Sequence, residues 1–594
     1  MTPSPMALEA EKTPHHAPNT AAMGAEKELH RTASHPADSG SKSDFGGITE
    51  GQHPAAAQEP QDDSDVVYPQ GLARVLIITC LCLSVFLVAL DQTIIAPALG
   101  AITAQFDSTK DIGWYGSAYL LTSTALQPLY GKLYNNFAVK TIYLIAIFVF
   151  EIGSLVCAVA PSSTAFIVGR AVAGMGTAGL FSGAIVVLAY TLPLRQRPAA
   201  FGLIGAMWGV ASVAGPLLGG AFTDHVTWRW CFYINLPIGG ATVVFLFFLL
   251  NIKGQKKQDS SFIQKILKLD LLGTATLIPA VICLLLALQW GGTTYAWNNS
   301  RIIGLFVGFA ALAALFIGIQ IWKGDEATLP PRFFKNRNVL SAMLFSVFFG
   351  AAFFPLIYYL SLYFQAVNGD SAVQAGIKLL PLLLATVLMS ILSGGLISAI
   401  GYYNPVALPC MVLFAVGAGM ITTFGLDSPI RVWLGYQVLC GLGIGVGFQL
   451  GVLVVQNVLP AADIPVATAC VQFFNSFGGA IFIAVAQTVF QNGLIEGVEK
   501  NVPGLDPQIF INSGASQVRE ILQEMGMQQY TDAVLNAYLG GLRNTYYISV
   551  ACATAAFFAV LGMDWVSLKR KKADNPKQRT ESEVSDVEAQ SKQI

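Results

Sequence analysis

Long apolar runs separated by short polar connections occupy most of the chain after residue 71. A helix that crosses a bilayer needs about 20 mostly apolar residues, and runs of about this length recur fourteen times. We predict membrane-spanning helices over 72–98, 112–130, 141–160, 165–191, 201–222, 231–251, 271–290, 302–322, 339–364, 373–399, 404–425, 432–458, 466–490 and 545–566. The pattern therefore predicts an all-α polytopic membrane protein.

Basic side chains are distributed unevenly beside these runs. One set of flanks holds most of the lysines and arginines, including Lys132, Lys140, Arg332, Arg337 and the KRKK run at 569–572. Lysine and arginine favour the cytoplasmic side of a membrane. We therefore predict that these flanks, together with both chain termini, are cytoplasmic.

The same pattern divides the chain into segments. We predict a disordered tail over 1–70, a six-helix half over 71–252, a linker with two inserted helices over 253–325, a second six-helix half over 326–566 and a C-terminal tail over 567–594. The N-terminal tail is rich in Ala, Pro, Ser and charge, a composition that cannot bury enough apolar surface to fold. Within the second half, we expect an outer loop over 491–544 with two short amphipathic helices, SQVREILQEMG and TDAVLNAYLGGL.

An internal repeat supports two related halves. Shifting the sequence by 267 positions aligns Gly174 with Gly441 and Gly176 with Gly443. Paired halves around a site near the middle of the bilayer occur in many secondary transporters. The repeat therefore favours a transporter over a channel or a receptor.

The composition agrees with this interpretation. Hydrophobic residues make up 54% of the chain and charged residues 12%, whereas soluble domains carry about 25% charged residues. The net charge of −1 gives no reason to expect a nucleic-acid partner. The nine cysteines lack the spacing of a metal site, and five of the six histidines lie in the N-terminal tail, so an enzyme is the least favoured class. No G-x-x-x-x-G-K-[ST] stretch occurs, so we expect an ion gradient, and no cofactor, to supply the energy.

Five stretches carry a resemblance to a known family. They are LDQTIIAPALG (90–100), LQPLYGKLYNNFAVK (126–140), GRAVAGMGTAG (169–179), WGVASVAGPLLGGAFTD (208–224) and WRWCFYINLPIGG (228–240). With these motifs the chain resembles the fourteen-span drug:proton antiporters of the major facilitator superfamily, and closely their fungal toxin and multidrug efflux members. One departure is that Gly131 and Lys132 are kept, while Tyr134 and two asparagines replace the acidic and basic residues of the general pattern.

The resemblance implies a function. It implies the major facilitator fold, with two inserted helices, and proton-coupled export of amphipathic organic compounds such as fungal metabolites, mycotoxins or antifungal drugs. It also implies a monomer in the plasma membrane, with the vacuolar membrane as the alternative, whose partners are the organic substrate, protons and membrane lipids. A proton-coupled importer of a small organic solute or an iron chelate is the competing hypothesis, and the glycine-proline stretch of the fifth span, which marks exporters in this superfamily, argues against it.

Three ionisable residues lie deep inside predicted spans: Asp91, Glu151 and Arg170. A charge at the bilayer centre costs about 2.5 to 3.5 kcal/mol even on a lenient scale. Asp91 and Arg170 lie within a few Å of the same depth, at about 1.5 Å per residue, so they can pair. Burial favours the protonated carboxyl and a nearby guanidinium favours the ionised one, so a change in their separation could load or release a proton. The resemblance places both residues in the proton-coupling machinery; the alternative is a static ion pair, and Glu151 could carry protons or only bond to its neighbours.

The repeat pairs the charged residues of the first half with neutral residues of the second. It aligns Arg170 with Gln437 and Asp91 with Tyr358. We predict a substrate cavity of mixed aromatic and polar character, lined by Gln127, Tyr358, Tyr359, Gln437, Gln449, Gln472 and Asn475. Gln127, which precedes Pro128, could instead belong to a helix kink.

Small residues recur in two spans, and one sequon occurs. The conformational or packing motifs are Gly131 and Lys132 in the loop, Gly174 and Gly176 in the fourth span, and Gly209, Gly215, Pro216 and Gly219 in the fifth. Small-xxx-small faces let helices approach closely, and the fifth-span face could also seal the two halves against leakage. Asn298 begins an N-x-S sequon and is a candidate glycosylation site.

Overall fold

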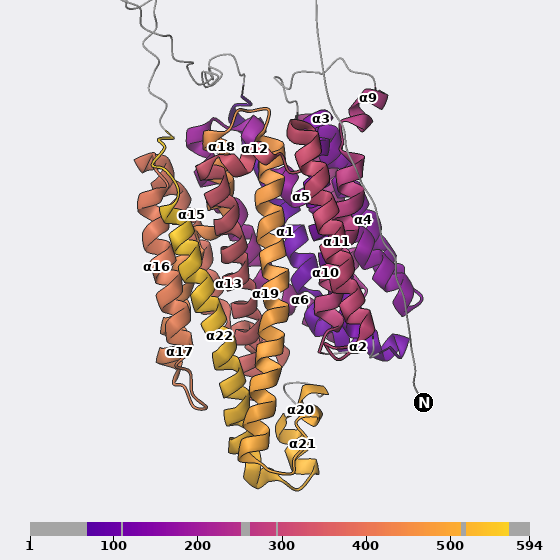
Figure 1. Ribbon diagram of the computed structural model, residues 1–594, viewed down its shortest axis with the longest axis vertical. Coiled ribbons are helices and arrows are strands. Elements are labelled where there is room, and N and C mark those ends of the chain that lie inside the picture. Colours follow the sequence, from indigo (N-terminus) through magenta and orange to yellow (C-terminus); the bar gives the residue numbers. More distant parts are fainter. Residues whose placement is uncertain (1–67, 109–110, 251–261, 293–294, 513–517, 569–594) are drawn as a thin grey trace, which may run out of the picture. The chain divides into compact units, whose positions relative to one another are not determined.

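A computed structural model describes residues 68–108, 111–250, 262–292, 295–512 and 518–568. The first half contains α1 (Gly71–Thr93), α2 (Ile95–Phe106), α3 (Ile112–Asn136), α4 (Val139–Val159), α5 (Ser163–Thr191), α6 (Arg197–His225), α7 (Trp230–Tyr233) and α8 (Asn235–Leu249). The inserted segment contains α9 (Phe262–Leu267), α10 (Leu271–Trp290) and α11 (Ser300–Lys323). The second half contains α12 (Pro331–Lys335), α13 (Arg337–Ala366), α14 (Ala372–Lys378), α15 (Leu380–Ile400), α16 (Asn404–Ile421), α17 (Ile430–Ile444), α18 (Gly447–Val458), α19 (Ile464–Asn501), α20 (Gln508–Asn512), α21 (Val518–Glu524) and α22 (Thr531–Leu561) (Figure 1).

The predicted all-α polytopic fold is confirmed. Within the described residues, thirteen helical stretches are long and apolar enough to cross a membrane. The predicted span over 112–130 corresponds to α3, which has 25 residues but is more polar than the others. Helix α3 packs against α5 of its own half and α19 of the other half, so its polar side chains can face the interior of the protein.

The two halves repeat the same backbone contacts. A Cβ atom on Gly176 of α5 would overlap Phe150 of α4, and one on Gly443 of α17 would overlap Phe414 of α16. In both halves, only a glycine permits this approach between neighbouring helices. The predicted correspondence between Gly176 and Gly443 therefore reflects equivalent packing.

The connection between α19 and α22 is shorter than the outer loop predicted over 491–544. Helix α19 continues to Asn501, and α22 begins at Thr531, so TDAVLNAYLGGL is the first part of a long helix and not a separate one. These extensions pack closely, because a Cβ on Gly497 would lie 2.7 Å from the Cβ of Ala537. Helices α20 and α21 lie at this end of α19 and α22 (Figure 1), where the Tyr538 hydroxyl donates to the carbonyl of Phe510 at 2.9 Å.

At the opposite end, which we call the Lys132 end, the two halves touch. Gly131 and Lys132, which we predicted in a loop, lie instead in the last turns of α3. Lys132 Nζ donates to the carbonyl of Glu326 at 3.0 Å and so holds the segment that leads into the second half. A Cβ on Gly131 would lie 2.7 Å from the Cβ of Ala469 in α19, which leaves no room for a side chain at this glycine. Arg197 of α6 donates to Gln456 of α18 at 3.2 Å.

Asp270, which the sequence analysis did not single out, organises the inserted helices. Its side chain caps α10 by accepting from the backbone N–H of Gly273 at 3.0 Å, and Lys323 at the end of α11 lies 3.1 Å from the same oxygen. The other carboxylate oxygen accepts from both the N–H and the hydroxyl of Thr328 at 2.8 Å, and from Gln320 Nε2 at 3.1 Å. One buried carboxylate therefore joins α10, α11 and the connection to the second half.

We predict that Asp270→Asn lowers the thermal unfolding midpoint of the purified protein. Burial alone would raise the pKa of Asp270, but the hydrogen bonds from Gln320, Thr328 and Gly273 and the contact with Lys323 lower it overall. A folded-state pKa below the unfolded value stabilises the protein above the unfolded pKa, and this contribution is lost as the pH falls through the folded pKa. The substitution should cost about 2 kcal/mol at neutral pH, as expected for hydrogen bonds to a charged group.

The matched control is Asp325→Asn, because Asp325 is 72% exposed and pairs with Arg332 at 3.4 Å on the surface. Exposed pairs contribute about 0 to 1 kcal/mol, so this variant should unfold like the wild type. Equal midpoints for the two variants at neutral pH would contradict the role given to Asp270.

Candidate functional site

An ion pair lies buried between α1 and α5. Asp91 Oδ2 lies 2.5 Å from Arg170 Nη1, and the two side chains are 0% and 1% exposed. Asp91 occupies the last turns of α1, just before Ile94 separates α1 from α2, and Arg170 follows two turns after the start of α5. The structure thus brings together Asp91 and Arg170, which we predicted to pair because they lie at similar depths in their spans.

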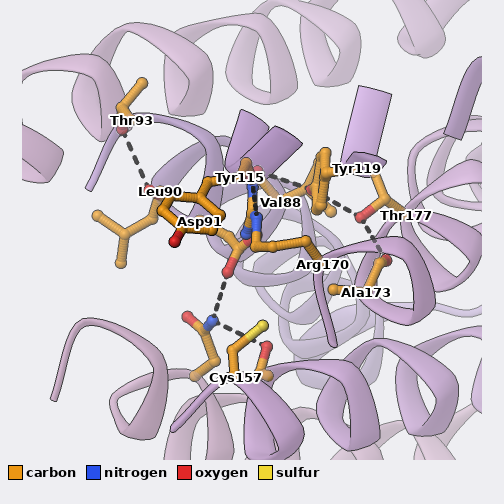
Figure 2. A network of polar contacts seen from close by, with 12 residues as sticks. Val88, Leu90, Asp91, Thr93, Tyr115, Tyr119, Cys157, Arg170, Ala173 and Thr177 are labelled. Atoms are coloured by element: carbon orange, nitrogen blue, oxygen red, sulfur yellow. Dashed lines mark hydrogen bonds and ion pairs between the residues drawn. The ribbon is translucent and has the colours of Figure 1, made fainter. Parts of the chain in front are cut away.

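Further contacts fix both partners (Figure 2). Arg170 Nε donates to the carbonyl of Tyr115 at 2.8 Å, and its guanidinium lies 4.4 Å from the centre of the Tyr119 ring. Asn235 of α8 donates to Asp91 Oδ1 at 3.1 Å. Each carboxylate oxygen therefore has a donor, which is what a buried ionised carboxylate requires.

Sequence reasoning missed Asn235. The signal was available, because this amide interrupts the apolar stretch CFYINLPIGG at the start of the sixth predicted span. Its Nδ2 also lies 3.1 Å from Ser154 Oγ of α4, so it ties α4 and α8 to the ion pair.

Glu151 lies apart from this network. Its carboxylate lies against Gly239 of α8, where an added Cβ would overlap it. Both carboxylate oxygens are buried without a hydrogen-bond partner among the described residues. Among the described residues, Glu151 therefore lacks the hydrogen bonds to its neighbours that were one of its two predicted roles.

A cavity lies between the two halves. The lining residues are Val88, Gln92, Leu120, Ser123, Thr124, Gln127, Thr177, Phe181, Trp208, Phe354, Phe448, Gln472, Asn475, Ser476, Gly479, Ala480 and Ile483. None of these side chains carries a charge, so the cavity is suited to an uncharged compound.

The cavity has an aromatic part and an amide part. Trp208 of α6 stacks on Phe448 of α18 with ring centres 6.2 Å apart and an angle of 13° between the ring planes. On α3 and α19, Gln127 Nε2 lies 3.4 Å from Ser476 Oγ, one turn after Gln472. Three buried polar atoms of the lining lack a protein partner among the described residues: Gln127 Oε1, Trp208 Nε1 and Gln472 Nε2.

The predicted cavity residues separate into two groups. Gln127, Gln472 and Asn475 line the cavity, whereas four others do not. Tyr358 is 58% exposed on the outside of α13, and its neighbour Tyr359 is buried against Phe490, with ring centres 5.6 Å apart.

The remaining two predicted cavity residues bond within the second half. Gln449 Nε2 lies 2.6 Å from Ser390 Oγ of α15. Gln437 Nε2 donates to the carbonyl of Lys378 at 3.0 Å, much as Arg170 Nε donates to the carbonyl of Tyr115. Gln437 is therefore the neutral counterpart of Arg170 in position and in bonding, and it is a structural residue away from the cavity.

The glycines of α6 face two different directions. An added Cβ on Gly209 would overlap Val387 of α15 in the other half, whereas on Gly215 and Gly219 it would overlap Thr93 and Ile94 of the first half. Six residues along a helix rotate the side-chain direction by about 240°, so one face cannot hold all three. The expectation that the whole stretch seals the halves was wrong for Gly215 and Gly219. Pro216 lies beside them inside α6. A Cβ added to Gly376 of α14, in the other half, would lie 3.6 Å from the Pro216 ring.

Two other predicted residues lie where their roles permit. Gly174 of α5 lies against the backbone of Tyr119, where a Cβ would overlap the carbonyl oxygen. Asn298 is exposed in the connection between α10 and α11, beside Asn299, which caps α11. Glycosylation of Asn298 remains a prediction.

Comparison with known proteins agrees with this architecture. Residues 81–483 match the Major Facilitator Superfamily. The efflux pump MFS1 of Arthroderma benhamiae is 49% identical over 529 residues, which is 89% of this chain and 97% of the pump. The efflux pump aflT of Aspergillus parasiticus is 46% identical over 504 residues, covering 84% of this chain and 97% of that protein.

Solved structures share the fold at low sequence identity. The human organic anion transporter MFSD10 superposes with a TM-score of 0.54 at 16% identity, over 83% of this chain and all of that one. The proton:xylose symporter XylE superposes with a TM-score of 0.52 at 13% identity, over 84% of this chain and 98% of the symporter. On the sequence match and the identity to its relatives, this multi-pass membrane protein belongs to the major facilitator superfamily.

Proposed function

We propose that the protein is a proton-coupled antiporter that exports uncharged amphipathic organic compounds by alternating access. The observation that carries the proposal is the buried Asp91–Arg170 pair in a half that borders an uncharged cavity. Relatives with 46% to 49% identity over more than four-fifths of the chain are named efflux pumps, which supports the outward direction of transport.

In this proposal, Asp91 is the proton-binding group. Protonation would cancel the charge of the carboxylate and weaken its bond to Arg170, while Asn235 could still bond the carboxyl group. Arg170 would remain held by the carbonyl of Tyr115 and by the Tyr119 ring. The pair can therefore open on protonation without leaving the guanidinium in apolar surroundings, which an ion pair with no other partner could not do.

We also infer the orientation. The Lys132 end carries most of the basic flanks, so we assign it and both termini to the cytoplasm. The contacts of Lys132 with Glu326 and of Arg197 with Gln456 close the protein at this end. We assign the protein to the plasma membrane, where export would remove a compound from the cell; the vacuolar membrane is the alternative location.

One proton per cycle suffices for useful export. A proton that crosses a potential of about 100 mV yields about 2.3 kcal/mol, and each pH unit adds about 1.4 kcal/mol. Together these terms support a concentration ratio of several hundred for a neutral compound. One titrating carboxyl group is therefore enough, and Glu151 need not carry a second proton.

We predict that Asp91→Asn reduces proton-driven transport at least about 10-fold while the protein stays folded, since an amide can keep the hydrogen bonds but cannot exchange a proton. The measurement is accumulation of coumarin, flavone and Nile red, which are uncharged aromatic probes, in inside-out vesicles with an acidic interior. The control is Asp325→Asn, whose exposed side chain lies outside the site and which should transport like the wild type.

Uphill accumulation by Asp91→Asn at the wild-type rate would contradict the role of Asp91. Wild-type accumulation that survives a protonophore would contradict proton coupling altogether. Accumulation only in right-side-out vesicles with an inward proton gradient would favour the importer.

We predict that Gln472→Leu raises KM about 10-fold for flavone, which can accept hydrogen bonds, because an unsatisfied or lost hydrogen bond costs about 1.4 kcal/mol. The matched control is Gln437→Leu, since Gln437 is an equally buried glutamine of the same half that does not line the cavity. Equal KM values for the two variants would show that the cavity amides do not contact the substrate.

A further inference from the structure

One side chain lies between the ion pair and the cavity. The ring of Tyr119 lies under the guanidinium of Arg170 at 4.4 Å, and its hydroxyl lies 2.7 Å from Thr177 Oγ1 (Figure 2). Thr177 lines the cavity. Tyr119 itself is 1% exposed and does not line the cavity, so it touches the two sites without belonging to the substrate surface.

Each hydroxyl of this link also has a backbone carbonyl within reach. Thr177 Oγ1 can donate to the carbonyl of Ala173 at 3.1 Å, and the Tyr119 hydroxyl can donate to the carbonyl of Val88 at 3.4 Å. A hydroxyl has a single hydrogen but two acceptor positions, so one of the two hydroxyls donates to the other, which in turn donates to its carbonyl. The Tyr119 hydroxyl thereby holds the Thr177 side chain in one orientation at the cavity wall.

The helices that carry this link are in backbone contact. Gly174, three residues before Thr177, lies against the carbonyl of Tyr119 with no room for a Cβ. The Tyr119 hydroxyl also lies 3.4 Å from the carbonyl oxygen of Val88 on α1, and Val88 lines the cavity. A shift of the Tyr119 ring would therefore act on α1 and α5 at the cavity wall.

The geometry points to Tyr119 as the positioning residue that couples the protonation state of Asp91 to the affinity of the cavity for substrate. This inference rests on the proposed antiport function. When Asp91 is ionised, Arg170 is held toward it over the Tyr119 ring; when Asp91 is protonated, that hold is weakened, and the cation over the ring can move. Because coupling between two binding sites is reciprocal, substrate in the cavity would change the proton affinity of Asp91 by the same factor.

Other ionisable groups near Asp91 do not provide such a link. Glu151 and Cys157 on α4, Cys231 on α7 and Tyr115 on α3 are close enough to interact with Asp91 or Arg170. The Tyr115 hydroxyl bonds to Ser108 and Ser163, away from the cavity. Helices α2 and α8 contain no ionisable residue, and those of α6 lie at its ends. None of these groups lines the cavity.

The test uses Tyr119→Phe, which keeps the ring and removes the hydroxyl, and Thr177→Val, which removes the hydroxyl on the other side of the bond. The full-length protein in lipid nanodiscs is titrated with coumarin, flavone and Nile red. We expect the wild-type Kd of at least one probe to change about 5-fold or more between about pH 5 and about pH 8. In both variants the change should fall below about 2-fold, and probe binding should no longer exchange protons with a weakly buffered solution.

The matched control is Tyr134→Phe. Tyr134 is also buried on α3, and its hydroxyl donates to the carbonyl of Gly179 on α5 at 2.9 Å. This variant loses one bond between the same two helices, toward the Lys132 end, and should keep the wild-type pH dependence. If loss of any hydrogen bond between α3 and α5 were enough to change the pH dependence, Tyr134→Phe would change it as much as Tyr119→Phe does.

Wild-type pH dependence in Tyr119→Phe would overturn the inference, and so would an equal loss in Tyr134→Phe. If Tyr119→Phe does not fold, wild-type pH dependence in Thr177→Val overturns it instead. The Asp91→Asn variant distinguishes failure of this inference from failure of the proposed function. If Asp91→Asn loses transport while Tyr119→Phe keeps the wild-type pH dependence of probe binding, only the role of Tyr119 is refuted. Failure of all three probes to bind the wild type would refute the cavity assignment and the link together.

Discussion

A buried charge without a partner is the constraint on which this structure depends. Removing one member of a buried ion pair costs about 3 to 5 kcal/mol, so neither Asp91 nor Arg170 can be released alone at little cost. The protein surrounds the pair with Asn235, the carbonyl of Tyr115 and the ring of Tyr119, which come from α8 and α3. These helices are thereby held around α1 and α5, and the protonation of Asp91 that we propose would weaken the arrangement without removing either side chain.

The two halves use equivalent positions differently. Arg170 and Gln437 both donate to a backbone carbonyl of a neighbouring helix, so the packing role of the side chain is common to both halves. Only the first half adds an acid, and therefore only that half can respond to protons at this position. The second half instead contributes amides and aromatic rings to the cavity, from Phe354, Phe448 and α19.

The fold, the ion pair and part of the cavity could be predicted from the sequence, because span length and depth depend on local pattern alone. The counterpart of Asp91 in the second half could not, since the repeat offset is not constant. Tyr115 corresponds to Lys378 and Phe150 to Phe414, which are fewer positions apart than the 267 that relate Arg170 to Gln437. An offset taken from one pair of helices therefore gives the wrong counterpart for Asp91, which lies on a different helix. The residue that it gave, Tyr358, is exposed on the outside of the helix bundle. The faces of Gly209 and Gly215, by contrast, follow from helical rotation and could have been separated in advance.

The carboxylate of Asp270 limits how the inserted helices α10 and α11 could be removed from a chain of this kind. Its Oδ2 accepts from the N–H of Thr328, and Gln320 accepts from the N–H of Leu329. The backbone that enters the second half therefore depends on the inserted helices and their cap for its hydrogen bonds. Excising α10 and α11 would leave these buried N–H groups unsatisfied, at about 1 to 3 kcal/mol each. A related chain without α10 and α11 would thus need different residues around Thr328 and Leu329 to bond these N–H groups. Deleting the two helices alone would not give a stable twelve-span protein.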